Sequence, residues 1–596
     1  MTYRSKPAIV IFTSSALATA QKLAHLTDGE IIDAACGDEK AAPLLARLFH
    51  QKRPIIGVCA AGILIRALAP LLRDKHDEPP VLAVSQNGAS IVPLLGGHHG
   101  ANRLAREIAA GSGGHAALTT ASDSKFLHGL DAPPPGYVLA NPKDAKPVMA
   151  KALQGEAIAL TGLAPWLAEA GYAISGEGGI KITVTEKCPS GDGLTYHPKT
   201  LVAGMGCERG AGSNELIALL TETLSGADLA AQSLAAIATI DVKADEAALH
   251  AIARHFDVPL RVFAADDLAA EAARLENPSE IVRAEVGTPG VSEAAALKAG
   301  ELLVPKRKSK RATCAIGRAP QPVDIGGFGR APGTLHLVGI GPGEAMQRTA
   351  SAMAALDGAT DWVGYGLYLD LIGDLRINQS EHRFGLGDEE PRVRHALELA
   401  ATGKTVALVC SGDAQIFAMA ALVYELLDAK GARAISEAAN RVQVESHPGI
   451  SAFQMASSRV GALIGHDFCC ISLSDLLTPR ADILQRLSAA AEGDFVTAFY
   501  NPRSKRRTDL IVAAKRIFCA NRPSGTPVII ASNLGRLEER VRVVKLAEFN
   551  PEEIDMLTIV LIGSSQSRAF QRGDGETIAF TPRGYARKAK KRVGCA

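Results

Sequence analysis

Residues 335–346 read LHLVGIGPGEAM, and this stretch decides the fold of the second half of the chain. A short apolar run enters a turn with three glycines and one proline, and a helical pattern follows. The dinucleotide fingerprint GxGxxG begins at Gly339 and Gly341, but its third position is Glu344, where a carboxylate would repel a pyrophosphate. The turn therefore favours a ligand held by close backbone contact and shape rather than by phosphate charge.

Three later stretches have the same strand-then-turn character. They are TVALVCSGDAQIFAMA (405–420), SHPGISAFQMAS (446–457) and FVTAFYNPRSKRR (495–507). Turns that follow the carboxyl ends of strands are where open α/β sheets bind ligands. Each turn alone is a weak signal, because Gly-Asp and Pro-Gly turns are common, so the information lies in their order along the chain.

That order resembles the tetrapyrrole methylases, a family that uses S-adenosylmethionine. The resemblance rests on GIGPGE (339–344), VGYGLYLDLI (363–372), SGDAQIFAMA (411–420), HPGISA (447–452), FYNPRSKRR (499–507) and TIVLIGSS (558–565). Within the family, the chain is most similar to the precorrin-3B C(17)-methyltransferases of cobalamin biosynthesis. The resemblance implies a domain over 334–575 with two α/β subdomains, about 334–450 and 451–575, and a homodimer formed through this domain. It also implies methylation of precorrin-3B at carbon 17, with ring contraction to precorrin-4.

The resemblance places the cofactor on the quoted turns. The implied S-adenosylmethionine-binding residues are Gly339, Gly341, Pro342, Gly343, Gly412, Asp413, Ile416, Phe417, Ser451, Ala452, Tyr500 and Asn501. Methyl transfer from a sulfonium needs mainly alignment of methyl and acceptor, so no metal site is expected. Ring contraction also requires a general base, for which the candidates are Asp370, Asp374, His382, His447 and Asp475.

The substrate is a macrocycle fringed with carboxylates, which pair well with arginine. Candidates for this contact are Arg383, Arg392, Arg394, Arg503, Lys505, Arg506 and Arg507. Two alternatives stay open for this half: another acceptor in the same fold, including the cobalt-containing intermediate, and a nicotinamide dehydrogenase. The stretch VGYGLYLDLI argues against another acceptor, although it does not indicate whether the substrate contains cobalt. Glu344 argues against the dehydrogenase.

In the first half, short β-branched runs alternate with alanine-rich helical stretches, as in PAIVIF (7–12) followed by SSALATAQKLAHL (14–26). This alternation predicts α/β layers with mostly parallel sheets. The whole chain is therefore expected to be a multidomain α/β protein. Segment 318–333 is expected to link the two halves, and 576–596 to form a basic tail.

The turn GGHHGAN (96–102) opens a helix and carries two histidines suited to proton transfer. Together with LVAGMGCERGAGSNELIALL (201–220) and VGTPGVSEAAAL (286–297), it resembles the cobalt-precorrin-5A hydrolases, the CbiG family. The resemblance implies α/β hydrolase-family domains over 1–135, 136–198 and 199–317, which open a δ-lactone and release acetaldehyde, with His98 and His99 as catalytic residues. The family pattern is close to SGHxGGAN, and here the turn is one residue shorter. The alternative is a non-catalytic corrinoid-binding module.

The composition bounds the remaining possibilities. A formal net charge of +1 gives no global attraction to nucleic acid or to anionic membranes. The ten cysteines form no CxxC pair, which argues against a zinc site and fits a reduced compartment. No apolar run is long enough to span a bilayer, and the amino terminus lacks the layout of a signal peptide. A cytoplasmic enzyme with a small-molecule tetrapyrrole substrate is expected.

Overall fold

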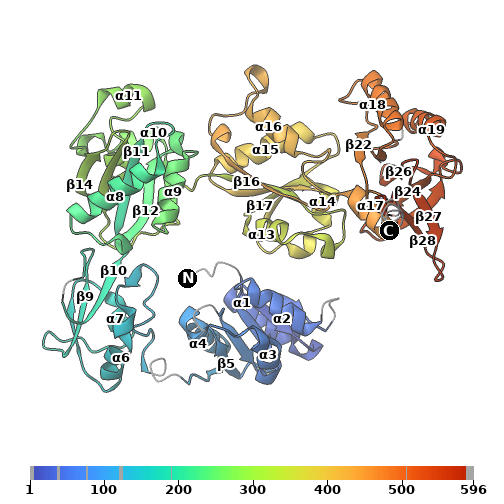
Figure 1. The fold of residues 1–596 in the computed structure, drawn as a ribbon. Helices are drawn as coiled ribbons and strands as arrows, with labels where there is room; N and C mark the ends of the chain where they lie inside the picture. Colours follow the sequence, from blue (N-terminus) through green and yellow to red (C-terminus); the bar gives the residue numbers. More distant parts are fainter. Residues whose placement is uncertain are drawn as a thin grey trace, which may run out of the picture. The chain divides into compact units, whose positions relative to one another are not determined.

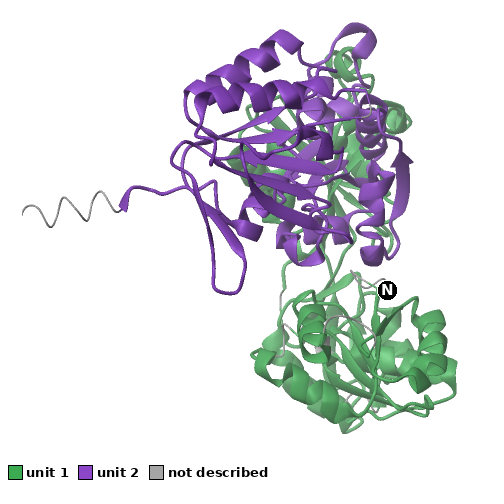
Figure 2. Cartoon of the chain, turned by 90° about the vertical axis from the view of Figure 1, so that its right-hand side faces the viewer, with its two compact units in different colours: residues 1–331 green, residues 332–596 purple. Residues whose placement is uncertain are grey.

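The computed structural model describes residues 6–35, 40–74, 78–119, 125–189, 191–504 and 506–585, while the side chain of His98 lies outside this description. The chain divides into two compact units, residues 1–331 and 332–596 (Figure 2). Among the described residues, no helix combines the length and the apolar character that crossing a membrane requires.

The first domain of unit 1 is a doubly wound sheet (Figure 1). Its strands, in spatial order, are β2 (Glu30–Asp33), β1 (Ala8–Ile11), β3 (Ile55–Val58), β4 (Val81–Val84), β5 (Ser90–Leu95) and β6 (His115–Ala116). Strands β1 to β4 are parallel, and β5 runs antiparallel to β4. Short, wholly apolar strands suit a sheet that is covered on both faces. One face packs against α1 (Leu17–Thr27) and α4 (Ala101–Ser112), and the other against α2 (Ala41–His50) and α3 (Ala61–Leu68).

Two further sheets complete unit 1. The middle sheet has the order β7 (Tyr137–Leu139), β10 (Leu194–Pro198), β9 (Ile180–Val184) and β8 (Ile158–Thr161), beside α6 (Ala145–Leu153) and α7 (Pro165–Glu169). The third has the order β13 (Leu260–Phe263), β12 (Leu234–Ile240), β11 (Leu201–Cys207), β15 (Ala312–Arg318) and β14 (Glu301–Lys308). Helices α8 (Ser213–Gly226) and α9 (Ala247–His255) cover one face, and α10 (Ala265–Ala269) and α12 (Ser292–Leu297) cover the other.

The segment expected to link the halves, 318–333, packs for most of its length against the third sheet. Val262 and Arg330 exchange both of their backbone hydrogen bonds, and Phe328 lies edge-on to Phe263 at 5.2 Å between ring centroids. Of the basic residues that precede this segment, Lys306, Arg307 and Lys308 lie on β14, and Lys310 and Arg311 lie in the turn before β15. Apolar residues such as Phe328, scattered among the glycines and prolines, are the physical reason that this segment is not a free connection.

Unit 2 begins with a five-stranded sheet that is parallel throughout. Its spatial order is β18 (Ser380–Phe384), β17 (Asp361–Tyr365), β19 (Thr405–Cys410), β16 (Thr334–Gly339) and β20 (Gln443–His447). Helices α13 (Ala350–Gly358) and α14 (Gly366–Asp370) lie on one face, and α15 (Glu389–Ala401) and α16 (Ala420–Leu427) lie on the other (Figure 1). All five strands therefore end at the same edge.

The second sheet of unit 2 is mixed. Its order is β22 (Phe468–Ser472), β23 (Val496–Tyr500), β26 (Thr558–Ile562), β24 (Pro527–Ser532) and β25 (Arg540–Lys545). Helix α17 (Ala452–Val460) packs on one face, and α18 (Arg480–Glu492) and α19 (Asp509–Asn521) pack on the other. A small third sheet contains β21 (Gly461–Ala462), β28 (Thr577–Phe580) and β27 (Arg568–Gln571). Part of the expected tail 576–596 is thus a strand, while 586–596 lie outside the described residues.

Candidate functional site

Three of the quoted turns meet at the carboxyl edge of the parallel sheet. They follow β19, β16 and β20, which are neighbours in that order. Gly341 and Gly412 donate backbone hydrogen bonds to each other's carbonyl oxygens, at 3.1 Å and 2.9 Å. Asp413 accepts a hydrogen bond at Oδ2 from the backbone N–H of Gly449, at 3.0 Å. Residues far apart in sequence thus form one connected backbone surface.

Glycine is required where these turns touch. A Cβ atom at Gly449 would lie 2.2 Å from the carbonyl oxygen of Gly412 and 2.5 Å from that of Gly339. Gly412 itself has a positive φ of 68°, and a Cβ atom there would touch the backbone of Ile450 to Ala452 at an ordinary van der Waals distance of 3.9 Å. Glycine therefore lets the turns close on one another at Gly449 and adopts the left-handed backbone at Gly412.

Two aromatic rings, Phe417 of the first subdomain and Tyr500 of the second, border the same edge. The rings of Phe417 and Tyr500 lie 5.1 Å apart, and Phe417 is half exposed with a positive φ of 51°. The backbone N–H of Phe453 donates to the hydroxyl oxygen of Tyr500 at 3.4 Å. Burial raises the pKa of Tyr500, so its hydroxyl stays protonated at neutral pH. Ile416 packs against the core of the second subdomain.

The beginning of α17 and the end of β23 complete this edge. Ser451 is the N-cap of α17, and its backbone N–H donates to Oε1 of Gln454 at 3.0 Å, which positions Ala452 at the first turn of the helix. Asn501 adopts a positive φ of 48° and donates to Oγ of Ser472 at 3.2 Å. All twelve residues implied as cofactor-binding therefore lie on these connected turns or directly beside them.

Glu344, which argued against a dinucleotide, joins the two subdomains. Its carboxylate lies 2.7 Å from Nη2 of Arg459 on α17, and Arg459 also pairs with Glu539 at 2.7 Å. Arg536 adds a hydrogen bond from Nε to the carbonyl oxygen of Pro342, at 3.3 Å. The first turn is therefore braced by charge from the second subdomain, next to Gly343.

In unit 1, a pocket of about 450 Å³ opens at the carboxyl ends of β1, β3 and β4. Its lining includes Thr13, Cys59, Ser85, Gln86 and Ser90. Nε2 of Gln86 donates to Oγ1 of Thr13 at 3.1 Å. Burial raises the pKa of the Cys59 thiol to about 11, so it is protonated at neutral pH. The chain order changes direction between β1 and β3, and such a switch point is the usual ligand crevice of a doubly wound sheet.

The histidine turn lies at the opposite edge of that sheet. Leu95, at the end of β5, pairs with Val81, the first residue of β4, so the turn Gly97–His99 is beside the amino ends of the parallel strands. A strand of four residues spans about 13 Å. His99 is exposed there. No sequence motif predicted the pocket, because its lining residues come from three strand ends that are far apart in sequence and have ordinary composition.

The glycine turn after β11 already holds a carboxylate of the protein itself. Gly210 donates its backbone N–H to Oε1 of Glu246 at 2.8 Å, and Arg209 pairs with Asp245 at 2.6 Å. Burial raises the pKa of Cys207 to about 11, which disfavours a thiolate nucleophile.

Family models match three parts of the chain. Residues 334–550 match the Tetrapyrrole (Corrin/Porphyrin) Methylases, residues 43–123 the model described as Cobalamin synthesis G N-terminal, and residues 201–317 that described as Cobalamin synthesis G C-terminus. A precorrin-3B C(17)-methyltransferase of Sinorhizobium sp is 40% identical over 254 residues, which is 43% of this chain and 98% of that relative. The chain belongs to the tetrapyrrole methylases.

Other relatives of the methylase unit are longer. A cobalt-factor III methyltransferase of Priestia megaterium is 41% identical over 256 residues, and the match covers 43% of this chain but 46% of that relative. The chain thus spans about half the length of this relative. A crystal structure of the methyltransferase CobJ matches with 38% identity and a TM-score of 0.38, covering 42% of this chain and 100% of that one. The matches to the family models and to the Sinorhizobium relative confirm the resemblances that the motifs predicted.

Within the methylase, the candidate bases divide by position. Asp370 and Asp374 follow β17, at the carboxyl edge of the parallel sheet, which we call the ligand edge. Asp370 pairs with Arg383 at 2.8 Å, and Asp374 pairs with Arg348 at 3.6 Å. Asp475 lies 3.8 Å from both Arg480 and Arg507.

The two histidine candidates are turned toward the body of the sheet. His382 is 2.9 Å from Asp361, a buried residue at the amino end of β17, and 2.9 Å from His395. His447 contacts Ser351 and His336.

Most of the candidate substrate-binding arginines of the methylase already have hydrogen-bond or ion-pair partners within the protein. Arg392 is buried and donates to the carbonyl oxygen of Gly385, Arg394 donates to those of Arg433 and Ala434, and Arg503 pairs with Glu552. Arg507 donates to the carbonyl oxygen of Asn501. Arg506 is exposed and makes no ion pair within the described residues, whereas Lys505 lies outside them.

Proposed function

We propose that the methylase unit transfers the methyl group of S-adenosylmethionine to carbon 17 of precorrin-3B, with ring contraction to precorrin-4. The observation that carries this proposal is the connected edge of glycine turns faced by Phe417 and Tyr500. The Sinorhizobium relative, which is a precorrin-3B C(17)-methyltransferase matched over 98% of its length, supports the same substrate.

The residues at this edge fit the cofactor. The half-exposed Phe417 and its neighbour Ile416 offer apolar contact for a purine, and the first turn of α17 offers backbone N–H donors. When bound, S-adenosylmethionine supplies an activated methyl group on a sulfonium. The protein's own contribution is alignment and exclusion of water, which is positioning catalysis.

The deciding experiment incubates the full chain with S-adenosylmethionine and either metal-free precorrin-3B or its cobalt-containing counterpart, followed by mass spectrometry. We expect a product heavier by one CH₂ group from the metal-free substrate, formed with S-adenosylhomocysteine. Turnover of the cobalt compound alone would transfer the proposal to the alternative suggested by the name of the Priestia relative. Failure with both would refute methyl transfer to this macrocycle.

Arg506 tests how the methylase binds the carboxylate-fringed substrate. We propose that this exposed side chain contacts a substrate carboxylate, because its neighbours Arg503 and Arg507 already have partners. Arg506→Ala should raise KM for the macrocycle about tenfold and leave KM for S-adenosylmethionine unchanged. Arg516→Ala, on the neighbouring helix α19, is the matched control. Equal effects of the two variants would remove Arg506 from substrate binding.

For unit 1 we propose the lactone-opening reaction of the CbiG-like hydrolases. Water adds to the lactone carbonyl and the ring C–O bond breaks, which leaves a carboxylate and a free hydroxyl on the two-carbon fragment. As this hydroxyl loses its proton, the C–C bond to the macrocycle breaks, the fragment leaves as acetaldehyde, and the electron pair of that bond stays on the macrocycle. The matches to both Cobalamin synthesis G models support this assignment. Fusion of the two activities would keep a labile contracted ring near an enzyme that acts on it after one further methylation.

Two variants distinguish the candidate sites of this hydrolysis, the histidine turn and the pocket, which lie at opposite edges of the first sheet. Full-length protein is mixed with a lactone-containing corrinoid, and acetaldehyde is measured for the wild type, His99→Ala and Gln86→Ala. Loss of product with His99→Ala alone supports the histidine turn, and loss with Gln86→Ala alone supports the pocket. No acetaldehyde from folded wild type would favour a corrinoid-binding module instead.

The family resemblance also supports a homodimer formed through the methylase unit. Light scattering during gel filtration should give twice the chain mass of 62.3 kDa. A monomer at micromolar concentration would contradict this proposal.

A further inference from the structure

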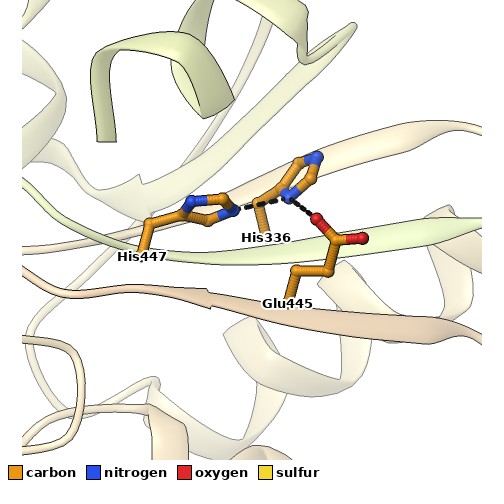
Figure 3. A group of neighbouring side chains, drawn as sticks. All are labelled: His336, Glu445 and His447. Carbon is orange, nitrogen blue, oxygen red and sulfur yellow. Dashed lines mark hydrogen bonds and ion pairs between the residues drawn. The ribbon is translucent and has the colours of Figure 1, made fainter. Parts of the chain in front are cut away.

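Three side chains with metal-ligating atoms converge between β16 and β20, next to the turn that follows β20 (Figure 3). His336 lies directly opposite Glu445 in the parallel register of the two strands. Glu445 and His447 are two residues apart, so both side chains leave the same face of β20. The sheet geometry itself therefore gathers the three groups, although His336 is more than a hundred positions away in sequence.

The distances are close to those that a metal ion requires. Nε2 of His447 lies 2.9 Å from Nδ1 of His336, and this same Nδ1 lies 3.5 Å from Oε2 of Glu445. All three ligand atoms lie within 4.8 Å of one another. Two nitrogen ligands of a tetrahedral ion, each at about 2.05 Å, are about 3.3 Å apart. The two imidazoles need to separate by only a few tenths of an ångström.

The surroundings prepare the histidines for coordination. The side chain of His336 is largely shielded from solvent, with 13% of its surface exposed. Nδ1 of His447 lies 2.7 Å from Oγ of Ser351 on α13, so Nε2 is directed toward the other two groups. Metal-bound histidines commonly have such a partner on the second ring nitrogen.

We propose that His336, Glu445 and His447 bind one divalent transition-metal ion, of the class of Zn²⁺ or Co²⁺, with a water molecule in the remaining position. Two imidazoles and one carboxylate suit such ions, whereas Mg²⁺ and Ca²⁺ prefer oxygen ligands throughout. The ion would fasten the edge strand β20 to β16. His447 directly precedes Pro448 and Gly449, so this brace would steady the turn that closes on Gly412.

Cobalt absorption provides the test. Untagged full-length protein is dialysed against EDTA and then against buffer, and titrated with Co²⁺ alone at pH 7.5. We expect one equivalent to bind with visible bands of tetrahedral intensity, and Zn²⁺ to displace it. Saturable binding should also raise the melting temperature, and EDTA should reverse the rise.

Variants assign the ligands. His336→Gln and His447→Gln should each weaken Co²⁺ binding at least 100-fold, and Ser351→Ala, which removes only the outer hydrogen bond, about tenfold. His395→Gln is the matched control, because it breaks the other histidine pair of this sheet, whose carboxylate Asp361 is held by Lys404 at 2.9 Å. The proposal is overturned if the wild type binds no stoichiometric Co²⁺, or if His395→Gln weakens binding as much as folded Ser351→Ala does.

Discussion

At the scale of single residues, the ligand edge of the methylase depends on the absence of side chains. Gly339, Gly412 and Gly449 belong to three separate turns, and each occupies the space that a Cβ atom of another would need. The sequence shows these glycines as loop punctuation, but only the structure shows that they touch. Their cost in chain entropy is offset by the close approach that they permit.

Substituting one of these glycines should disrupt both the site and the fold. In Gly449→Ala, the new Cβ would meet two carbonyl oxygens at 2.2 Å and 2.5 Å, so the turns must separate. We expect a loss of about 1–3 kcal/mol of unfolding free energy and a large loss of S-adenosylhomocysteine affinity, measured by urea denaturation and calorimetry. Gly358→Ala, where nothing lies within 4 Å, should leave affinity unchanged. Normal affinity in Gly449→Ala would show that the turns do not hold the cofactor.

Asp361 should contribute a measurable pH dependence. Burial tends to raise its pKa, but hydrogen bonds from His382, Lys404 and Thr360 prevail and lower it. Because the folded pKa is below the unfolded value of about 3.9, this stabilisation is complete above that value and is lost as pH falls through the folded pKa. Asp361→Asn should cost about 3 kcal/mol near pH 6, and the difference from wild type should shrink toward pH 2. A constant difference over this range would contradict the assignment.

At the scale of elements, α17 connects the ligand edge to the second sheet. Its first turn is held by a capping box, in which Gln454 accepts the backbone N–H of Ser451. Gln454→Ala should cost about 1 kcal/mol and weaken cofactor affinity, because the helix start would fray. Gln454→Glu, which keeps the acceptor, should restore both quantities. If Gln454→Glu were as weak as Gln454→Ala, the cap would not be the cause.

Strands were easier to predict than helix starts. The apolar run that opens 335–346 lies in β16, and the run TVALVC that opens 405–420 is β19, because buried parallel strands are continuous apolar runs. The helical pattern after the first turn forms an α-helix only from Ala350, where the side chain of Thr349 caps it. Helix α16 begins only at Ala420, because Phe417 adopts a left-handed conformation with its ring 5.1 Å from that of Tyr500. Local pattern does not report such tertiary demands.

The candidate site was predictable only where a motif carried it. The twelve residues implied as cofactor-binding came from a known order of turns, and they lie together. Phe453, the pocket of unit 1, and the His336–Glu445–His447 group came from no pattern. Each depends on which strands are neighbours in the folded sheets, and local sequence patterns do not contain that information.

At the scale of the whole molecule, the end of unit 1 is set by packing rather than by composition. A chain of residues 1–331 retains Phe328 against Phe263 and the pair between Arg330 and Asp241 at 3.1 Å, whereas a chain of 1–317 loses both. The longer chain should be more stable by about 2 kcal/mol or more, measured by urea denaturation of each. Equal stability would mean that segment 318–331 contributes nothing to the fold.

The joint between the units is very short. Arg330 is hydrogen-bonded to Val262 in unit 1, and the carbonyl oxygen of Gly333 accepts from Gln443 in unit 2, so only Ala331 and Pro332 are unanchored. The proline ring fixes one of their four main-chain torsions. The covalent connection between the two units therefore contains about three rotatable main-chain bonds. Two genes that encoded the units separately would replace this connection with two new chain ends, both at the margins of folded sheets.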